Sequence, residues 1–175
     1  GFIIADNYYE LYVNGKLVSV DNTPYTPFNS AIVKFKVKRP YTMAFLLVDW
    51  DEQLALGVEK MARLKEDWYL GDGGLIAKFS DGTVTDSSWK AQSFMTGPVD
   101  SPNDVVEKGN LHFFDKNGRT YPHVKKPVCR DDCYMVHYAQ PKNWRAKTFN
   151  DTQWPRAYEY TDREIGVTTL FGYTR

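Results

Sequence analysis

The stretch ADNYYELYVNGKLV, residues 5–18, decides the fold class of this chain. Tyr9, Leu11 and Val13 alternate with the residues between them, which is the period-two pattern of a strand with two unlike faces. The dipeptide NG that follows favours the positive φ angles of a type I′ turn. We therefore predict a β-hairpin here, with residues 17–20 as the returning strand.

The rest of the 175-residue chain has the composition of an all-β protein, and its length suits one domain over residues 1–175. Aromatic residues make up 15% of it, and turn-forming Asn, Asp, Gly and Pro recur between the aromatic segments. These features predict a β-sandwich with little helix. We expect further strands at residues 32–37, 42–50, 75–79, 91–94 and 134–138.

Three segments are harder to assign. Residues 52–66 could form an apolar helical face, but the alternation of Leu54, Leu56 and Val58 favours a strand that continues to Met61. Residues 96–109 and 115–128 are rich in Pro with Asp, Asn or Lys, and we predict long surface loops for both.

Charge and hydropathy exclude two classes of partner. The chain has 22 Lys and Arg against 22 Asp and Glu, so no long-range field favours nucleic acid or another polyanion. The longest wholly apolar run, residues 43–48, is far below the roughly 20 residues that cross a bilayer. We expect neither nucleic-acid binding nor membrane insertion.

Two later segments strengthen the prediction of the fold. DGGLIAKFSDGTVTDSSWKA, residues 72–91, and FNDTQWPRAYEYTDREIG, residues 149–166, follow the opening stretch. Together and in this order the three segments resemble the galactose-binding-domain-like jelly rolls attached to bacterial glycosidases and surface proteins. The resemblance implies a jelly-roll β-sandwich, but such a fold hosts many ligands. Members usually have one or two strands before the first segment, so we expect this sandwich to lack its first strands.

Each of the two later segments contains a turn followed by a tryptophan. Asp86 with two serines precedes Trp89, and Asn150 with Asp151 precedes Trp154. A large aromatic residue directly after a turn usually anchors the edge of a sandwich. We predict that both rings lie in the core.

Aromatic residues in loops suggest a different role. A sugar stacks its apolar face on an exposed ring, while its hydroxyls need polar groups nearby. The alternative is that these rings seal the ends of the sandwich. The candidate ligand-binding residues are Trp68, Tyr69, Asp67 and Asp72 in KEDWYLGDGG, with Tyr25 and Trp144 elsewhere.

The two cysteines, Cys129 and Cys133, are separated by three residues. A turn can bring their sulfurs together, and we expect a disulfide, as in secreted β-domains. A zinc site with His123 and His137 is the alternative, although the spacing departs from that of common zinc fingers.

No catalytic motif with its required context is present, so we predict no enzymatic activity and no required cofactor. Members of the resembled superfamily often carry a structural calcium ion. Asp21, Asn22 and Asp72 are candidate ligands for it, and the sequence does not choose among them.

Three functions follow from these predictions. The first is an extracellular carbohydrate-binding, lectin-like module whose partner is a glycan or polysaccharide. The second is a structural or adhesive module of a cell-surface assembly that exchanges a strand with neighbouring copies or domains. The third is an accessory domain of a larger glycosidase.

Overall fold

The computed structural model describes residues 1–23, 29–49, 58–61, 66–69, 74–108, 111–113, 132 and 134–160. Within these residues nearly all regular structure is β-strand, and the helical part is a single 3₁₀ turn, η1. The predicted all-β class is therefore confirmed for the described chain. The elements are β1 (Phe2–Asp6), β2 (Tyr8–Val13), β3 (Lys16–Val20), β4 (Asn29–Ile32), β5 (Met43–Val48), β6 (Val58–Met61), β7 (Glu66–Tyr69), β8 (Gly74–Lys78), β9 (Met95–Val99), η1 (Pro102–Asp104), β10 (Val106–Lys108), β11 (Leu111–Phe113) and β12 (Tyr134–His137).

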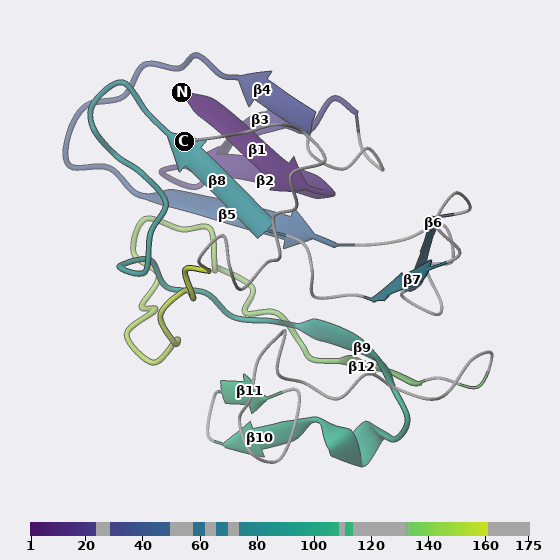
Figure 1. Ribbon diagram of the computed structural model, residues 1–175. Helices are drawn as coiled ribbons and strands as arrows, with labels where there is room; N and C mark the ends of the chain where they lie inside the picture. The colour runs from purple at the N-terminus through teal and green to yellow at the C-terminus, as the bar shows by residue number, and fades with distance from the viewer. Residues whose placement is uncertain are drawn as a thin grey trace.

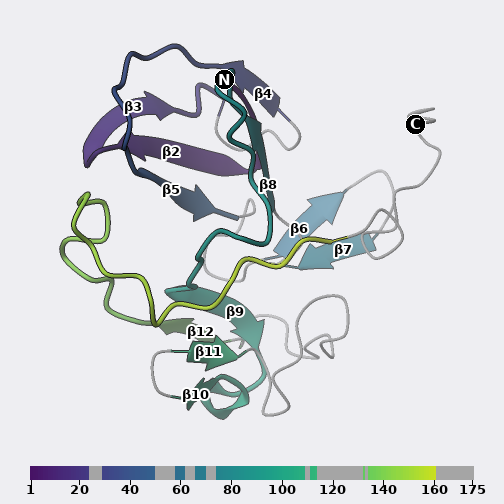
Figure 2. The same cartoon turned by 90° about the vertical axis from the view of Figure 1, so that its left-hand side faces the viewer.

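Two three-stranded antiparallel sheets, β4–β1–β8 and β3–β2–β5, form the main body. Figure 2 shows them side by side, with β3, β2 and β5 in one layer and β4 and β8 in the other. Buried apolar side chains of the two sheets meet between these layers. The members of this core are Ile3 and Ala5 of β1, Tyr9, Leu11 and Val13 of β2, Ala77 of β8, and Val33 and Phe79 next to the strands. The arrangement is a β-sandwich.

The predicted hairpin is confirmed. β2 and β3 pair antiparallel, with Val13 opposite Lys16. The turn between them has φ angles of 51° at Asn14 and 78° at Gly15, as a type I′ turn requires. β5 pairs with the other edge of β2, which places β2 in the centre of its sheet.

The strand β1 was not predicted. It begins before the stretch of residues 5–18 and ends within it, so one strand precedes the predicted hairpin, and the expectation that the first strands are missing is wrong to that extent. β1 is the central strand of its sheet, between β4 and β8. Ile3 and Ala5 are buried, whereas Phe2 is exposed, which is the alternation of a half-buried strand.

Two predicted segments are wrong: a strand at residues 91–94 and a loop at residues 96–109. Residues 91–94 are not a strand; the strand is β9, which pairs with β12. Residues 96–109 are not a loop, because they include most of β9, η1 and β10. The prolines and aspartates in this segment indicated a loop, yet Val99 and Val105 are buried.

The strand predicted at residues 32–37 begins earlier, as β4. The chain after it continues without a ladder, although the Val33 N–H still donates to Gly1 O at 2.9 Å. The strand predicted to continue to Met61 is confirmed over residues 58–61, which form β6. Residues 52–57 and 62–65 are outside the described residues, and Glu66 begins β7. Residues 115–128 also lie outside them.

Smaller antiparallel pairs complete the described chain: β6–β7, β10–β11 and β9–β12. The β6–β7 hairpin lies apart from the sandwich in both views (Figures 1 and 2). Among the described residues, no helix is both long enough and apolar enough to cross a membrane.

Candidate functional site

The two later segments that carry the family resemblance meet in space. Ala91 N–H donates to Pro155 O at 3.0 Å, and Ala157 N–H donates to Trp89 O at 2.8 Å. These reciprocal bonds form an isolated antiparallel bridge centred on Lys90. Pro155 has no N–H to give, but its carbonyl still accepts, so the proline does not prevent this pairing.

The turn before Trp89 determines where its indole lies. Asp86 Oδ1 accepts from Ser88 N–H at 2.8 Å, and Asp86 O accepts from Trp89 N–H at 3.2 Å. The indole Nε1 donates to Val84 O at 2.8 Å, and the ring packs against Phe45 with centroids 5.8 Å apart. Trp89 is half-buried, so the prediction of a core position is wrong. Its N–H is bonded to the backbone, and the ring also lines a surface depression.

Trp154 is also half-buried rather than in the core. Its ring packs against Phe94 and Phe149, with centroids 5.6 and 5.3 Å apart. Asn150 Oδ1 accepts from Thr152 N–H at 3.1 Å, which confirms the predicted turn before this tryptophan. This aromatic group supports the turn that carries Asp151.

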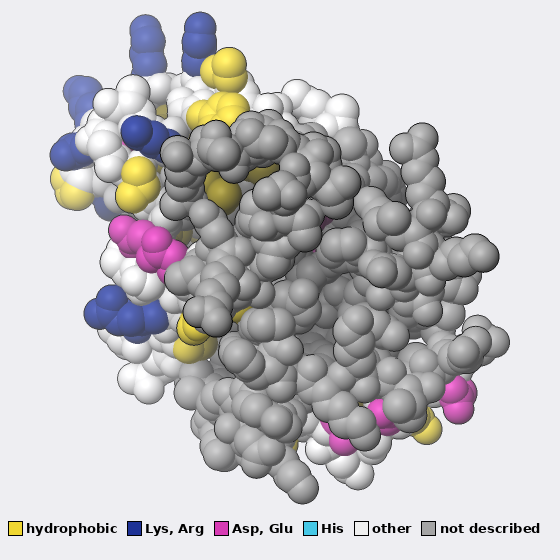
Figure 3. All heavy atoms as spheres, in the orientation of Figure 1, with side chains coloured by type: hydrophobic (Ala, Val, Ile, Leu, Met, Phe, Trp, Pro, Cys, Tyr) yellow, Lys and Arg dark blue, Asp and Glu magenta, His cyan; other side chains and the backbone are white. Residues whose placement is uncertain are grey.

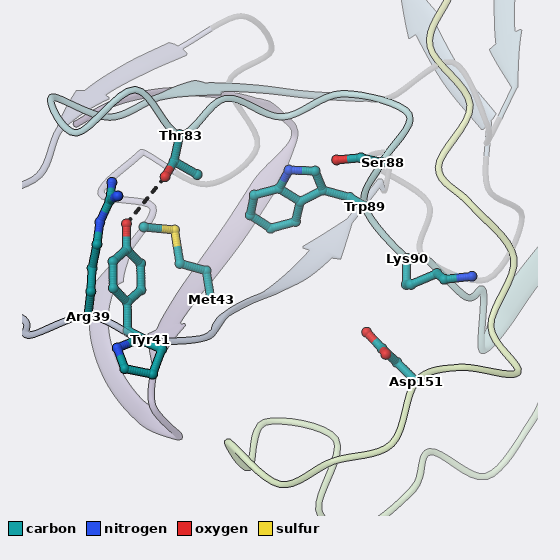
Figure 4. Close-up of a pocket in the computed structure, with 9 residues that line it drawn as sticks. Arg39, Tyr41, Met43, Thr83, Ser88, Trp89, Lys90 and Asp151 are labelled. Atoms are coloured by element: carbon teal, nitrogen blue, oxygen red, sulfur yellow. Dashed lines mark hydrogen bonds between the residues drawn. The ribbon is translucent and has the colours of Figure 1, made fainter.

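The depression has a volume of about 770 Å³ and is open to solvent. Three parts of the chain surround it: the segment that leads into β5, the turn before Trp89, and the turn at Asp151 (Figure 4). Its lining combines apolar and aromatic surface with hydrogen-bonding groups. The apolar members are Pro40, Tyr41, Met43 and Trp89, and the polar members are Arg39, Thr83, Ser88, Lys90 and Asp151.

A carboxylate just outside this lining holds one wall of the depression. Asp81 Oδ2 accepts from the Tyr41 hydroxyl and from Arg39 at 2.9 Å, and Asp81 Oδ1 accepts from Thr83 N–H at 3.1 Å. Hydrogen bonds from Tyr41, Arg39 and Thr83 hold the pKa of the Asp81 carboxyl well below its usual range. Asp81 therefore stays ionised and fixes the two side chains at neutral pH.

Two lysines connect other segments to the same region. Lys90 Nζ donates to Trp154 O at 3.0 Å, and Lys147 Nζ donates to Pro40 O at 3.2 Å. Both bonds join residues that are far apart in the sequence. The Lys90 bond joins the segment after Trp89 to the turn that carries Asp151, and the Lys147 bond joins the chain before that turn to the segment that leads into β5.

The chemistry of the depression suits recognition of polyhydroxylated ligands. Its described lining offers hydroxyl, ammonium, guanidinium and carboxylate groups beside aromatic surface. Glycoside hydrolysis generally uses a pair of facing carboxyl groups. Asp151 is the one carboxylate among the lining residues that the structure describes.

None of the residues predicted as the ligand site is among the described residues that line this depression. Asp67, Trp68 and Tyr69 belong to β7, whose backbone pairs with β6 from Val58 to Met61. They lie on a strand and not in a loop as expected. Tyr25 and Asp72 are outside the described residues.

Trp144 packs against the sandwich, as the alternative interpretation of the loop aromatics suggests. Its ring meets Tyr12 edge-on with centroids 5.5 Å apart. The Arg145 guanidinium lies 4.7 Å from the Tyr12 ring centroid and 5.0 Å from that of Trp144. Trp144 thus covers the outer face of β2.

The same outer face accounts for two of the tyrosines in the opening stretch. Tyr8 donates to Glu10 Oε1 at 3.0 Å, and Tyr12 donates to Glu10 Oε2. Burial, with the hydrogen bond to Glu10, raises the pKa of both phenols. Tyr9 points to the opposite face and is fully buried in the core.

The described residues neither support nor test most of the metal and disulfide predictions. Cys129, Cys133 and His123 lie outside them, so the disulfide and its zinc alternative remain predictions. Asp21 is buried, and its Oδ1 accepts from Thr23 N–H at 2.9 Å. In the part of the chain that the structure describes, no group of three or more His, Cys, Asp or Glu side chains is arranged to hold a metal ion.

Sequence reasoning missed the depression because it searched for aromatic residues in loops. The available signal was the turn and tryptophan shared by the two later segments. Comparison with known proteins gives no match to any protein-family model, curated protein or solved structure.

Proposed function

We propose that this chain is a non-catalytic carbohydrate-binding module of the galactose-binding-domain-like jelly-roll type, acting outside the cell or at its surface. The sugar binds in the depression, against Trp89. The observation that carries the proposal is a half-buried indole beside five polar side chains in one open depression. An accessory domain of a glycosidase would use the same site.

The size and chemistry of the depression support a saccharide ligand. Its volume of about 770 Å³ lies within the range of small-molecule sites. The apolar C–H face of a sugar ring stacks on the indole, and the hydroxyls bond to Ser88, Lys90 and Asp151. An open depression suits a chain end or a short internal stretch of a glycan.

The first experiment is a glycan array on the chain, followed by calorimetric titration of each glycan that binds. Asp151→Asn and Ser88→Ala remove groups from the depression while they leave the indole in place. We expect Asp151→Asn to weaken binding about tenfold, because a hydrogen bond to a charged group contributes roughly 1.5–3 kcal/mol. The melting temperature should not change, since the Asp151 side chain is exposed.

Glu159→Gln is the matched control, because Glu159 is also an exposed carboxylate but does not line the depression. Trp68→Ala tests the site predicted from the sequence. Unchanged affinity in Asp151→Asn and Ser88→Ala would overturn the proposed site. Loss of binding in Trp68→Ala alone would move the site to β7.

A second function is favoured by one observation on the β4–β1–β8 sheet. Phe2 pairs with Ile32, and Ile4 pairs with Ile76, so these side chains share one face of the sheet. Ile32 and Ile76 are 79% and 65% exposed. Apolar surface of this kind marks interfaces, which supports a structural or adhesive module that contacts a neighbour.

Sedimentation velocity over a range of protein concentrations tests this second function. We expect self-association that Ile32→Lys abolishes, with Lys142→Gln, on an exposed turn, as a control. A monomer at every concentration would contradict association with a second copy.

A further inference from the structure

A line of lysines follows the chain between β4 and β5. Val33 is buried, and Phe35 and Val37 pack against the core, whereas Lys34 and the next two alternate residues are exposed. This period-two alternation turns every second side chain toward solvent. The exposed members, together with Lys16 of β3, form what we name the lysine stripe: Lys16, Lys34, Lys36 and Lys38.

Three of these lysines surround a hollow. Lys16, Lys36 and Lys38 line a space of about 320 Å³ between the β2–β3 hairpin and the chain that follows β4. Arg39 is ion-paired with Asp81, and no lysine of the stripe takes part in that pair. Positive charges are thus grouped here, and no Asp or Glu is among the described residues that line the hollow.

The stripe leads directly into the depression. Arg39 follows Lys38 in the chain and lines the depression together with Lys90. Figure 3 shows Lys and Arg side chains gathered along the edge of the molecule where the chain between β4 and β5 runs in Figure 1. The zero net charge of the whole chain is therefore compatible with a local cluster of positive charge on this edge.

Within the depression itself the charges balance. Arg39 is paired with Asp81, and the lining holds one further cation, Lys90, and one further carboxylate, Asp151 (Figure 4). A neutral sugar unit is suited to this part. Uncompensated positive charge begins only at Lys38, next to it.

We infer that the ligand is an anionic glycan, a polysaccharide that carries carboxylate or sulfate groups. One unit occupies the depression, and the anionic groups of the neighbouring units lie over the lysine stripe. The lysine ammonium suits this role because it is a mobile point charge that tolerates varied anion geometry. This inference rests on the proposed function and specifies its ligand class.

The test is calorimetric titration with dextran sulfate, polygalacturonate and neutral dextran of similar length, at two salt concentrations. We expect an anionic polymer to bind at least tenfold more tightly than dextran, and to weaken as salt rises. The triple variant Lys34→Gln, Lys36→Gln, Lys38→Gln should raise Kd about tenfold or more at low salt and reduce the salt dependence. Each single variant should have a smaller effect.

Lys142→Gln is the control for one lost surface lysine, since Lys142 is exposed on a turn outside both the stripe and the depression. Every variant is first checked for an unchanged melting temperature. Asp151→Asn is titrated beside the lysine variants to report on the depression separately from the stripe.

The outcomes separate the two proposals. If neutral glycans bind as tightly as anionic ones and the triple variant changes nothing, the charge inference is overturned while the proposed function stands. A second outcome is that the triple variant loses binding, Asp151→Asn does not, and single-stranded DNA or phosphatidylserine vesicles bind as tightly as the anionic polysaccharides. The stripe is then a general polyanion surface, and both proposals fail. Absence of binding to any glycan also overturns both.

Discussion

At the residue scale, Asp81 is the group on which the wall of the depression depends. Its carboxylate accepts hydrogen bonds from Tyr41, Arg39 and Thr83, and bonds of this charge-assisted kind are stronger than neutral ones. Two of these donors approach from the segment that leads into β5. Removal of the charge should therefore loosen that segment without altering the core.

Asp81→Asn should lower the melting temperature at pH 7, and the difference from the native chain should shrink as the solution becomes acidic. The folded-state pKa of Asp81 is depressed, so its stabilisation is present above the pKa of an unfolded aspartate, about 3.9. It is lost as the pH falls through the lower folded-state value. Scanning calorimetry from pH 7 to pH 2 measures this change.

Glu159→Gln removes the same charge from an exposed position and is the control. A difference between Asp81→Asn and the native chain that stays constant down to pH 2 would contradict the assigned role of the charge.

Sequence reasoning could identify Asp81 only as part of a turn. Gly82 confirms that turn with a φ of 91°. The partners Tyr41 and Arg39 lie 40 and 42 positions earlier in the chain, and no local pattern links them to Asp81. Local chemistry predicts turns, whereas the long-range partner of a carboxylate depends on the packing of the sheets.

At the element scale, the β2–β3 hairpin depends on the backbone conformation of its turn. Gly15 has a φ of 78°, and a Cβ built on it would lie 3.4 Å from Arg145 O. Gly82 has a φ of 91° with no atom within 4 Å of such a Cβ, and Gly74 has neither feature. Gly15 and Gly82 therefore carry the backbone cost of a positive φ, and Gly74 is the control without it.

Gly15→Ala and Gly82→Ala should each lower the free energy of unfolding by about 1–2 kcal/mol, the cost of a left-handed conformation in a residue with a Cβ. The two effects should be similar, because a Gly15 Cβ would meet Arg145 O at an ordinary van der Waals distance. Gly74→Ala should stay within about 0.5 kcal/mol of the native chain. Urea denaturation of the three variants checks the order, and equal stability of Gly15→Ala and Gly74→Ala would contradict it.

The strands show which elements sequence patterns could predict. The hairpin follows a clear turn signal, and the strands predicted at residues 42–50, 75–79 and 134–138 correspond to β5, β8 and β12. β9 was misplaced because its sequence, MTGPV, contains glycine and proline, which indicate a loop when only local propensity is considered. It forms a strand because it pairs with β12, a long-range contact that the local sequence does not predict.

At the scale of the whole molecule, the β-sandwich and its accessory strand pairs predict a far-UV circular dichroism spectrum of β type. Helix should account for less than about a fifth of the residues, against an average near a third in soluble proteins. The 3₁₀ turn η1 is the one helical element among the described residues. A spectrum dominated by helix would contradict the fold.

The candidate site was beyond sequence prediction for a reason that applies to the whole molecule. Its lining combines Arg39, Trp89 and Asp151, which come from three distant parts of the chain. Sequence patterns located the turns before the two tryptophans, and the resemblance linked the segments in order. The meeting of those segments depends on long-range hydrogen bonds such as Lys90 Nζ to Trp154 O, which join residues 64 positions apart.

The bond between Lys147 Nζ and Pro40 O joins residues 107 positions apart. The depression therefore forms late in the synthesis of the chain. A growing chain could complete the β2–β3 hairpin early, because its contacts are local. The depression can close only after the segment that contains Lys147 and Asp151 has left the ribosome. If the proposed function holds, sugar binding by a nascent chain would report that residues 147–151 have been synthesised and packed beside the depression.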